Sequence, residues 1–150
     1  MPTQDELLKR YFLNTNKTQP EIVRMLRDSS MTECNIVVNA YKRYKMITTV
    51  VLFYSTQDLE QIIRDNSRVT DLISTMHIGD GFFTMVLLTF TTSEGGWKFA
   101  ENLAYQICNK NIGCRYYVDT VDDLAFHNID NFLGNFLFEI KDQTDCFDNQ

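Results

Sequence analysis

The stretch IGDGF, at residues 78–82, is the part of the sequence with the strongest indication of chemistry. It sets Asp80 between Gly79 and Gly81, and such an arrangement can bring a carboxylate and the bare backbone close to a metal ion or a phosphate. The same residues also suit a structural role, because Asp-Gly is a favoured pair in the tight turn of a β-hairpin. The helices and strands predicted around this stretch distinguish a binding loop from a structural turn.

Other reactive side chains are scattered along the chain. His77 and His127 have no nucleophile at a spacing that predicts a catalytic pair, and structural roles explain both histidines. The glycines of SEGGW suit the start of a helix better than a phosphate site, because the sequence has neither a P-loop nor a Gly-x-Gly-x-x-Gly fingerprint. A solvated acidic loop explains Asp122, Asp123 and Asp130. We therefore expect no enzymatic activity, no cofactor and no metal site.

The cysteines and the polarity of the chain bear on its location. Cys34, Cys108, Cys114 and Cys146 form no Cys-x-x-Cys pair, which favours reduced thiols in a cytosolic protein. The N-terminal residues MPTQDELLKR lack the apolar core of a secretory signal, and no apolar run approaches the length of a bilayer span. We expect a cytoplasmic protein without a membrane partner.

Charge is distributed unevenly. The net charge is −6, yet residues 1–46 hold eight Lys and Arg against five Asp and Glu, while the remaining residues hold six against fifteen. Phosphate contacts need positive charge only where they are made. The basic segment is therefore compatible with nucleic-acid binding, although chance also explains an imbalance of this size.

Residues 1–46 show helical periodicity. Apolar spacing predicts a short helix within residues 5–13, and a capping box of Thr18 and Glu21 opens a second helix. Thr32 is the N-cap expected for a third helix, which ends in the basic cluster YKRYK. The residues expected to form the apolar stripe of this third helix are Ile36, Val37, Ala40 and Tyr44.

These helices resemble the helix-turn-helix of bacterial and archaeal transcription regulators. In that motif T-Q-x-E-I-x-x-x-L precedes a turn serine and a threonine that opens the recognition helix, and the matching residues here are Thr18, Gln19, Glu21, Ile22, Leu26, Ser29 and Thr32. The resemblance implies that the recognition helix enters the major groove of DNA. Predicted base contacts are Ser30, Met31, Glu33 and Asn35, and predicted phosphate contacts are Lys17, Thr18, Lys42, Arg43 and Lys45. The alternative is a helical hairpin that packs on the rest of the chain or forms a dimer.

The acidic remainder alternates between strand-like and helix-like stretches. Runs of β-branched and aromatic residues predict strands at 46–55, 68–78, 82–91 and 114–121, and amphipathic stretches predict helices at 56–66 and 93–111. The order βαββαβ is that of the ferredoxin-like arrangement, an antiparallel sheet with its helices on one face. The predicted fold class is therefore α+β, with a helix-turn-helix-like segment preceding a ferredoxin-like sheet.

Two families of this topology have a glycine hairpin between their central strands. IGDGF and the upstream RVTD are similar to the diguanylate cyclase (GGDEF) domain, whose turn supplies a metal-binding carboxylate. That family needs two helices between its first two strands, whereas the chain between Met46 and Gly79 has room for one. Cyclase activity is therefore not expected, and a degenerate cyclic-dinucleotide module using Arg68 and Asp71 is left as one alternative.

The order and spacing of residues 47–124 also resemble the effector-binding domain of Lrp/AsnC (feast/famine) regulators, which follows a helix-turn-helix. The stretches that carry this resemblance are VTDLISTMHIGDGFFTMVLLTF and WKFAENLAYQICNKNIGCRYYVDTVDDL. The resemblance implies a homodimer or higher homo-oligomer that binds DNA half-sites about one helical turn apart. It also implies a small-molecule effector near the hairpin turn, at Gly79, Asp80 and Gly81.

We therefore divide the chain into a helix-turn-helix-like segment (1–46), a ferredoxin-like domain (47–141) and a polar tail (142–150). The expected function is a small transcription regulator that binds double-stranded DNA and dimerises through its ferredoxin-like domain. The alternative is a non-enzymatic protein-interaction or ligand-binding module whose N-terminal helices form an oligomerisation arm. No role is assigned to the apolar stretch 132–140.

Overall fold

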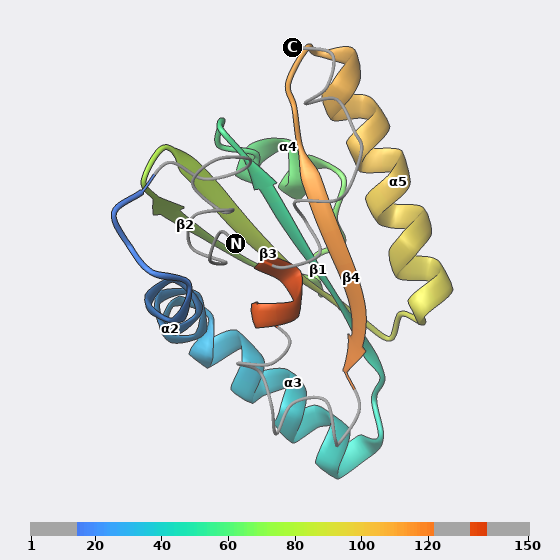
Figure 1. The fold of residues 1–150 in the computed structure, drawn as a ribbon. Coiled ribbons are helices and arrows are strands. Elements are labelled where there is room, and N and C mark those ends of the chain that lie inside the picture. Colours follow the sequence, from blue (N-terminus) through green and yellow to red (C-terminus); the bar gives the residue numbers. More distant parts are fainter. Residues whose placement is uncertain (1–14, 122–132, 138–150) are drawn as a thin grey trace.

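The computed structural model describes residues 15–121 and 133–137, and Figure 1 shows their arrangement. The elements are α2 (Gln19–Ser29), α3 (Met31–Tyr44), β1 (Thr48–Ser55), α4 (Glu60–Asp65), β2 (Leu72–Ile78), β3 (Gly81–Thr89), α5 (Ser93–Asn109) and β4 (Arg115–Val121), with a further helical turn at residues 133–137. The helix predicted within residues 5–13 and the tail 142–150 lie outside the described residues.

The four strands form one sheet in the order β2-β3-β1-β4, and every neighbouring pair is antiparallel. β1 lies between β3 and β4, with Thr48 opposite both Thr89 and Val121. All eight residues of β1 are buried, which explains its uninterrupted run of β-branched and aromatic residues. The predicted α+β class, with a four-stranded antiparallel sheet and helices, is confirmed.

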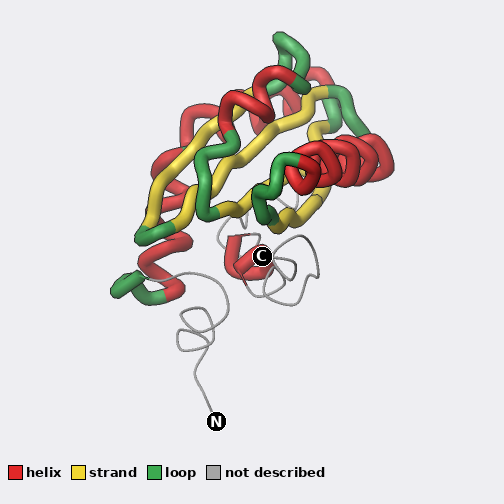
Figure 2. The backbone as a smooth tube through the Cα atoms, turned by 90° about the horizontal axis from the view of Figure 1, so that it is seen from above, coloured by secondary structure: helices red, strands yellow, loops and turns green. Residues whose placement is uncertain are grey.

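Helices cover both faces of this sheet. Val51 and Phe53 of β1 point to the face on which α4 and α5 pack, through residues such as Ile63 and Leu103. The alternate residues of β1 point to the other face, where they meet α2, α3 and residues 133–137 (Figures 1 and 2). Side chains that join this second core from outside the sheet are Ile22, Leu26, Cys34, Val37, Leu133, Phe136 and Leu137. The N-terminal helices thus share a hydrophobic core with the sheet.

The two glycines of the β2–β3 hairpin have different structural roles. Ile78 pairs with Gly81, so that Gly79 and Asp80 form a two-residue turn, and Gly79 has a φ of 60°, a conformation that glycine adopts without strain. Gly81 is a strand residue, and a Cβ atom there would collide with the ring of Tyr54. The hairpin therefore requires one glycine for the turn and another for close packing.

Candidate interaction surface

Helix α3 is fixed to the sheet along one side and exposed along the other. Its inner side buries Cys34 and Val37 in the core shared with β1 and β3. Ile36, expected in the buried stripe, is 51% exposed, and Tyr44 at the end of the helix is also exposed. The predicted stripe is therefore wrong at these two positions, because the sheet contacts the side of α3 that carries Cys34 and Val37.

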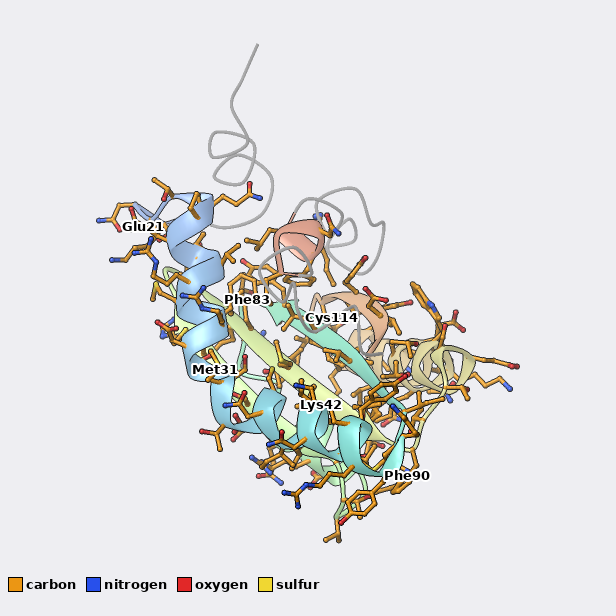
Figure 3. The ribbon with its side chains drawn as sticks, turned by 90° about the horizontal axis from the view of Figure 1, so that it is seen from below. Glu21, Met31, Lys42, Phe83, Phe90 and Cys114 are labelled. Carbon is orange, nitrogen blue, oxygen red and sulfur yellow. The ribbon has the colours of Figure 1, made fainter. Side chains whose placement is uncertain are left out.

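The outer side of α3 carries a continuous exposed stripe, which we call the α3 stripe. Its members are spaced by four, three and four residues, so they lie in line along one side of a helix. They are Thr32, Ile36, Asn39 and Arg43. Exposed residues beside the stripe are Met31, Asn35 and Lys42, and Figure 3 shows Met31 at the start of the helix and Lys42 towards its end.

Most of the side chains predicted to contact DNA are on this surface or near it. Met31, Asn35, Lys42, Arg43 and Lys45 are exposed on α3 or at its C-cap, whereas Glu33 is half-buried. Lys17 and Thr18 are exposed before α2, although the Thr18 hydroxyl accepts a hydrogen bond from the Glu21 amide as the predicted helix cap. Asn39 was not singled out from the sequence, and its place in the 4-3-4 spacing is the signal that identifies it.

Ser30 is the exception among the predicted base contacts. It is 1% exposed, and its hydroxyl donates to the Leu26 carbonyl oxygen at 2.8 Å. It is also the single residue between α2 and α3, where a helix-turn-helix has a turn of three to four residues. The Ser74 hydroxyl on β2 donates to the Ser29 carbonyl oxygen at 3.2 Å and holds this junction against the sheet. Ser30 is therefore a structural residue of the junction, unable to reach a base.

The C-terminal end of α3 is basic and ordered by local contacts. Lys45 is the C-cap in the left-handed conformation, with a φ of 55°, and its amide donates to the Tyr41 carbonyl oxygen at 2.8 Å. The Lys45 ammonium lies over the Tyr41 ring, 5.1 Å from its centroid. With Lys42 and Arg43, this end presents three exposed cations.

The hairpin turn predicted to bind an effector lies beside a buried polar pair. Gly79 and Asp80 are exposed, whereas Gly81 is buried under Tyr54. Burial raises the pKa of the Tyr54 hydroxyl, the Asp80 carboxylate raises it further, and the Arg115 guanidinium opposes both effects. Tyr54 and Arg115 are direct cross-strand partners and both are buried. The turn thus adjoins a core tyrosine whose cross-strand partner is a buried arginine.

Arg68 and Asp71, considered for cyclic-dinucleotide binding, form a structural bridge at the other end of β2. The Arg68 Nη2 lies 2.8 Å from an oxygen of Asp71, whose side chain is 2% exposed. The same nitrogen donates to the Thr89 carbonyl oxygen at 2.5 Å and to the Thr91 hydroxyl at 2.9 Å. This bridge joins the start of β2 to the end of β3, a role that the sequence did not reveal.

The remaining reactive residues that the structure describes are two buried thiols, a disulfide-bonded cysteine and a stacked histidine. Cys34 and Cys114 are buried thiols that form no disulfide, and burial is the main cause that raises the pKa of Cys34 to about 11. Cys108 is disulfide-bonded, so the expectation that every thiol is reduced is wrong for this residue. The exposed His77 ring stacks on Phe82 at 4.2 Å between centroids. His127, Asp122, Asp123, Asp130 and Cys146 lie outside the described residues.

The part of the chain that the structure describes contains neither a metal-binding cluster nor a membrane-spanning helix. Within residues 15–121 and 133–137, no three His, Cys, Asp or Glu side chains cluster in a way that would hold a metal ion. Among the helices that the structure describes, none has the length and apolar character needed to cross a membrane.

Comparison of the chain with protein-family models, with curated proteins and with solved structures finds no match.

Proposed function

We propose that the protein is a small DNA-binding regulator that uses the outer side of α3 as its recognition surface. The observation that carries this proposal is the exposure of the α3 stripe on a helix whose inner side is fixed in the core. A helix held in this way is pre-organised for insertion into the major groove, which admits one α-helix. The single-residue junction at Ser30 means that recognition would depend on α3 without a helix-turn-helix turn.

The chemistry of the exposed side chains supports DNA as the ligand. Asn35 and Asn39 carry amides of the kind that pair with adenine in the major groove. Lys42, Arg43 and Lys45 would contact phosphates. Residues 15–47, which form this layer, contain six Lys and Arg against three Asp and Glu, so the positive charge is concentrated where DNA would lie.

The sheet supports the rest of the expected regulator. Its chain order β1-α4-β2-β3-α5-β4, its strand order and the packing of α4 and α5 on one face are features of a split βαβ arrangement and support a ferredoxin-like domain. In the proposed cytoplasmic regulator this domain would form the homodimer. A small-molecule effector would bind at the exposed turn of Gly79 and Asp80. Gly81 would hold this turn in place by packing against Tyr54.

A second function, a non-enzymatic protein-interaction module, is favoured by apolar exposure on the same surface. Ile36 and Met31 are 51% and 40% exposed, and neither has a polar group to offer to DNA. Partially exposed aliphatic side chains on a rigid helix are typical of helix-mediated protein contacts.

A gel shift with random-sequence duplex over a series of salt concentrations tests the DNA proposal. Each phosphate contact contributes about −0.9 to the slope of log K against log salt, so replacing both Lys42 and Arg43 by Ala should weaken binding and reduce the slope by about 1.8. The matched control replaces Lys98 and Lys110 of the α5 region, both exposed, by Ala. A wild-type protein that gives no shift, or an unchanged slope in the Lys42/Arg43 variant, would refute DNA binding by α3.

A further inference from the structure

The α3 stripe is symmetric about the middle of its helix. α3 spans residues 31–44, so Ile36 and Asn39 lie equally far from its midpoint, as do Thr32 and Arg43. Two such helices can lie antiparallel about a two-fold axis through this midpoint. Ile36 of each copy then faces Asn39 of the other copy, and Thr32 faces Arg43. The 4-3-4 spacing is also that of the a and d positions along the seam of paired helices. We propose that the partner for this surface is a second copy of the chain, with the two α3 helices antiparallel.

Charge determines the orientation of the pair. The exposed cations Lys42, Arg43 and Lys45 gather at the C-terminal end, whereas Glu33 lies in the first turn of α3 and Asp28, just before the helix, is ion-paired with Arg27. A parallel pair would place the three cations against their own copies, and like charges at close range are unfavourable. An antiparallel pair keeps the two sets of cations apart and places each of them near Glu33 of the other copy. The surface is therefore self-complementary in one orientation.

The seam determines the register and the strength of the pair. Ile36, the large apolar member of the stripe, faces Asn39 of the other copy, and exposed Met31 lies beside the seam. A polar asparagine in such a seam fixes the alignment at a cost in stability. The association is therefore reversible and depends on protein concentration.

Among the other exposed apolar residues, Tyr44 ends α3 next to Arg43, whereas Ile47 and Phe90 lie outside the helix. Ile47 follows the C-terminal end of α3, and Phe90 lies past the end of β3, where Figure 3 shows it beyond α3. Ile47 is 45% exposed, close to the 51% of Ile36. Ile47 therefore provides a matched control for a substitution at Ile36.

Sedimentation velocity of the full-length protein over a wide concentration range tests the pairing. We expect the mass of the wild type to double as its concentration rises, from monomer to dimer or, where the sheet domain already forms a dimer, from dimer to tetramer. Ile36→Lys should lack this doubling, and Ile47→Lys should show it. Circular dichroism checks that both variants fold, and both substituted positions are exposed enough to accept a lysine. A wild type whose mass does not change with concentration, or a doubling that persists in Ile36→Lys, would overturn the proposal.

Cross-linking tests the orientation. In an antiparallel pair the two Thr32 residues are eleven residues apart along the seam, about 16 Å, which is beyond the reach of a disulfide. Thr32→Cys mixed with Arg43→Cys should therefore form a cross-linked heterodimer under mild oxidation, while Thr32→Cys alone should not. Cross-linking of Thr32→Cys with itself would instead indicate a parallel pair and overturn the proposal.

The pairing covers the side chains proposed to read DNA, and the two proposals can fail separately. These experiments contain no DNA, so a dimer that depends on Ile36 stands even if the gel shift is negative. A monomer that shifts DNA through Lys42 and Arg43 removes the pairing and keeps the DNA proposal.

Discussion

The substitution Gly81→Ala tests whether close packing against Tyr54 requires a glycine at this position of the hairpin. A Cβ atom at this position meets the Tyr54 ring, which is 1% exposed and enclosed by its neighbours, so the ring has no free space to move into. Overpacking of this kind costs about 1–3 kcal/mol. The backbone of Gly81 does not have a positive φ, so the whole effect should come from the collision with Tyr54.

A double-mutant cycle separates this collision from other effects of the substitution. Tyr54→Leu removes the ring and hydroxyl atoms nearest to Gly81, so Gly81→Ala should cost at least about 1 kcal/mol less in that background. Gly79→Ala is the control: it should cost about 1–2 kcal/mol because of its positive φ, with the same cost in both backgrounds. Urea denaturation gives the four free energies of unfolding for each cycle. Additive effects of Gly81→Ala and Tyr54→Leu would refute the packing role of Gly81.

Two further predictions concern α3. Val37→Ala should lower the free energy of unfolding by about 2 kcal/mol because it leaves a cavity in the core, whereas Ile36→Ala should change it by less than about 0.5 kcal/mol. Equal effects of the two substitutions in urea denaturation would contradict the finding that α3 turns Val37 towards the sheet and Ile36 away from it. Burial raises the pKa of Cys34 from 9.0 to about 11, so this thiol should resist a thiol reagent at pH 8 until the protein unfolds. Because the folded thiol keeps its proton between pH 9.0 and about 11 while the unfolded one loses it, stability should fall as the pH rises through this window, and less so in Cys34→Ala. Fast labelling of Cys34 in the native protein, followed by mass spectrometry, would contradict its burial.

Several features that depend on neighbouring residues could be predicted from the sequence, although the N-cap expected at Thr32 is wrong because α3 begins at Met31, after Ser30. The cap formed by Thr18 and Glu21 needs two residues three positions apart, and the structure contains it. The central strands β1 and β3 could be recognised because their β-branched and aromatic runs are buried whatever the details of their packing. The hairpin turn at Gly79 and Asp80 is equally local.

Features that depend on distant residues could not be predicted. Ile36 and Val37 are adjacent and both apolar, and only the position of the sheet decides that Val37 is buried and Ile36 exposed. Arg68 bonds to the carbonyl of Thr89, which is brought beside it by strand pairing. Gly81 needs to be a glycine because of Tyr54, a residue of another strand. In each case the missing information is a tertiary contact.

The two proposals for α3 make opposite predictions for one variant. Ile36→Lys places a cation in the middle of the α3 stripe, where Ile36 is half-exposed and makes no contribution to the buried core. If α3 reads DNA, the added charge should keep or strengthen binding and make it more sensitive to salt. If α3 pairs with a second copy, the introduced lysine is repelled by the lysine introduced in the other copy and by Arg43 across the seam. The dimer should then dissociate. Measured together, DNA affinity and self-association of Ile36→Lys therefore decide which partner this surface takes, because one substitution moves the two quantities in opposite directions.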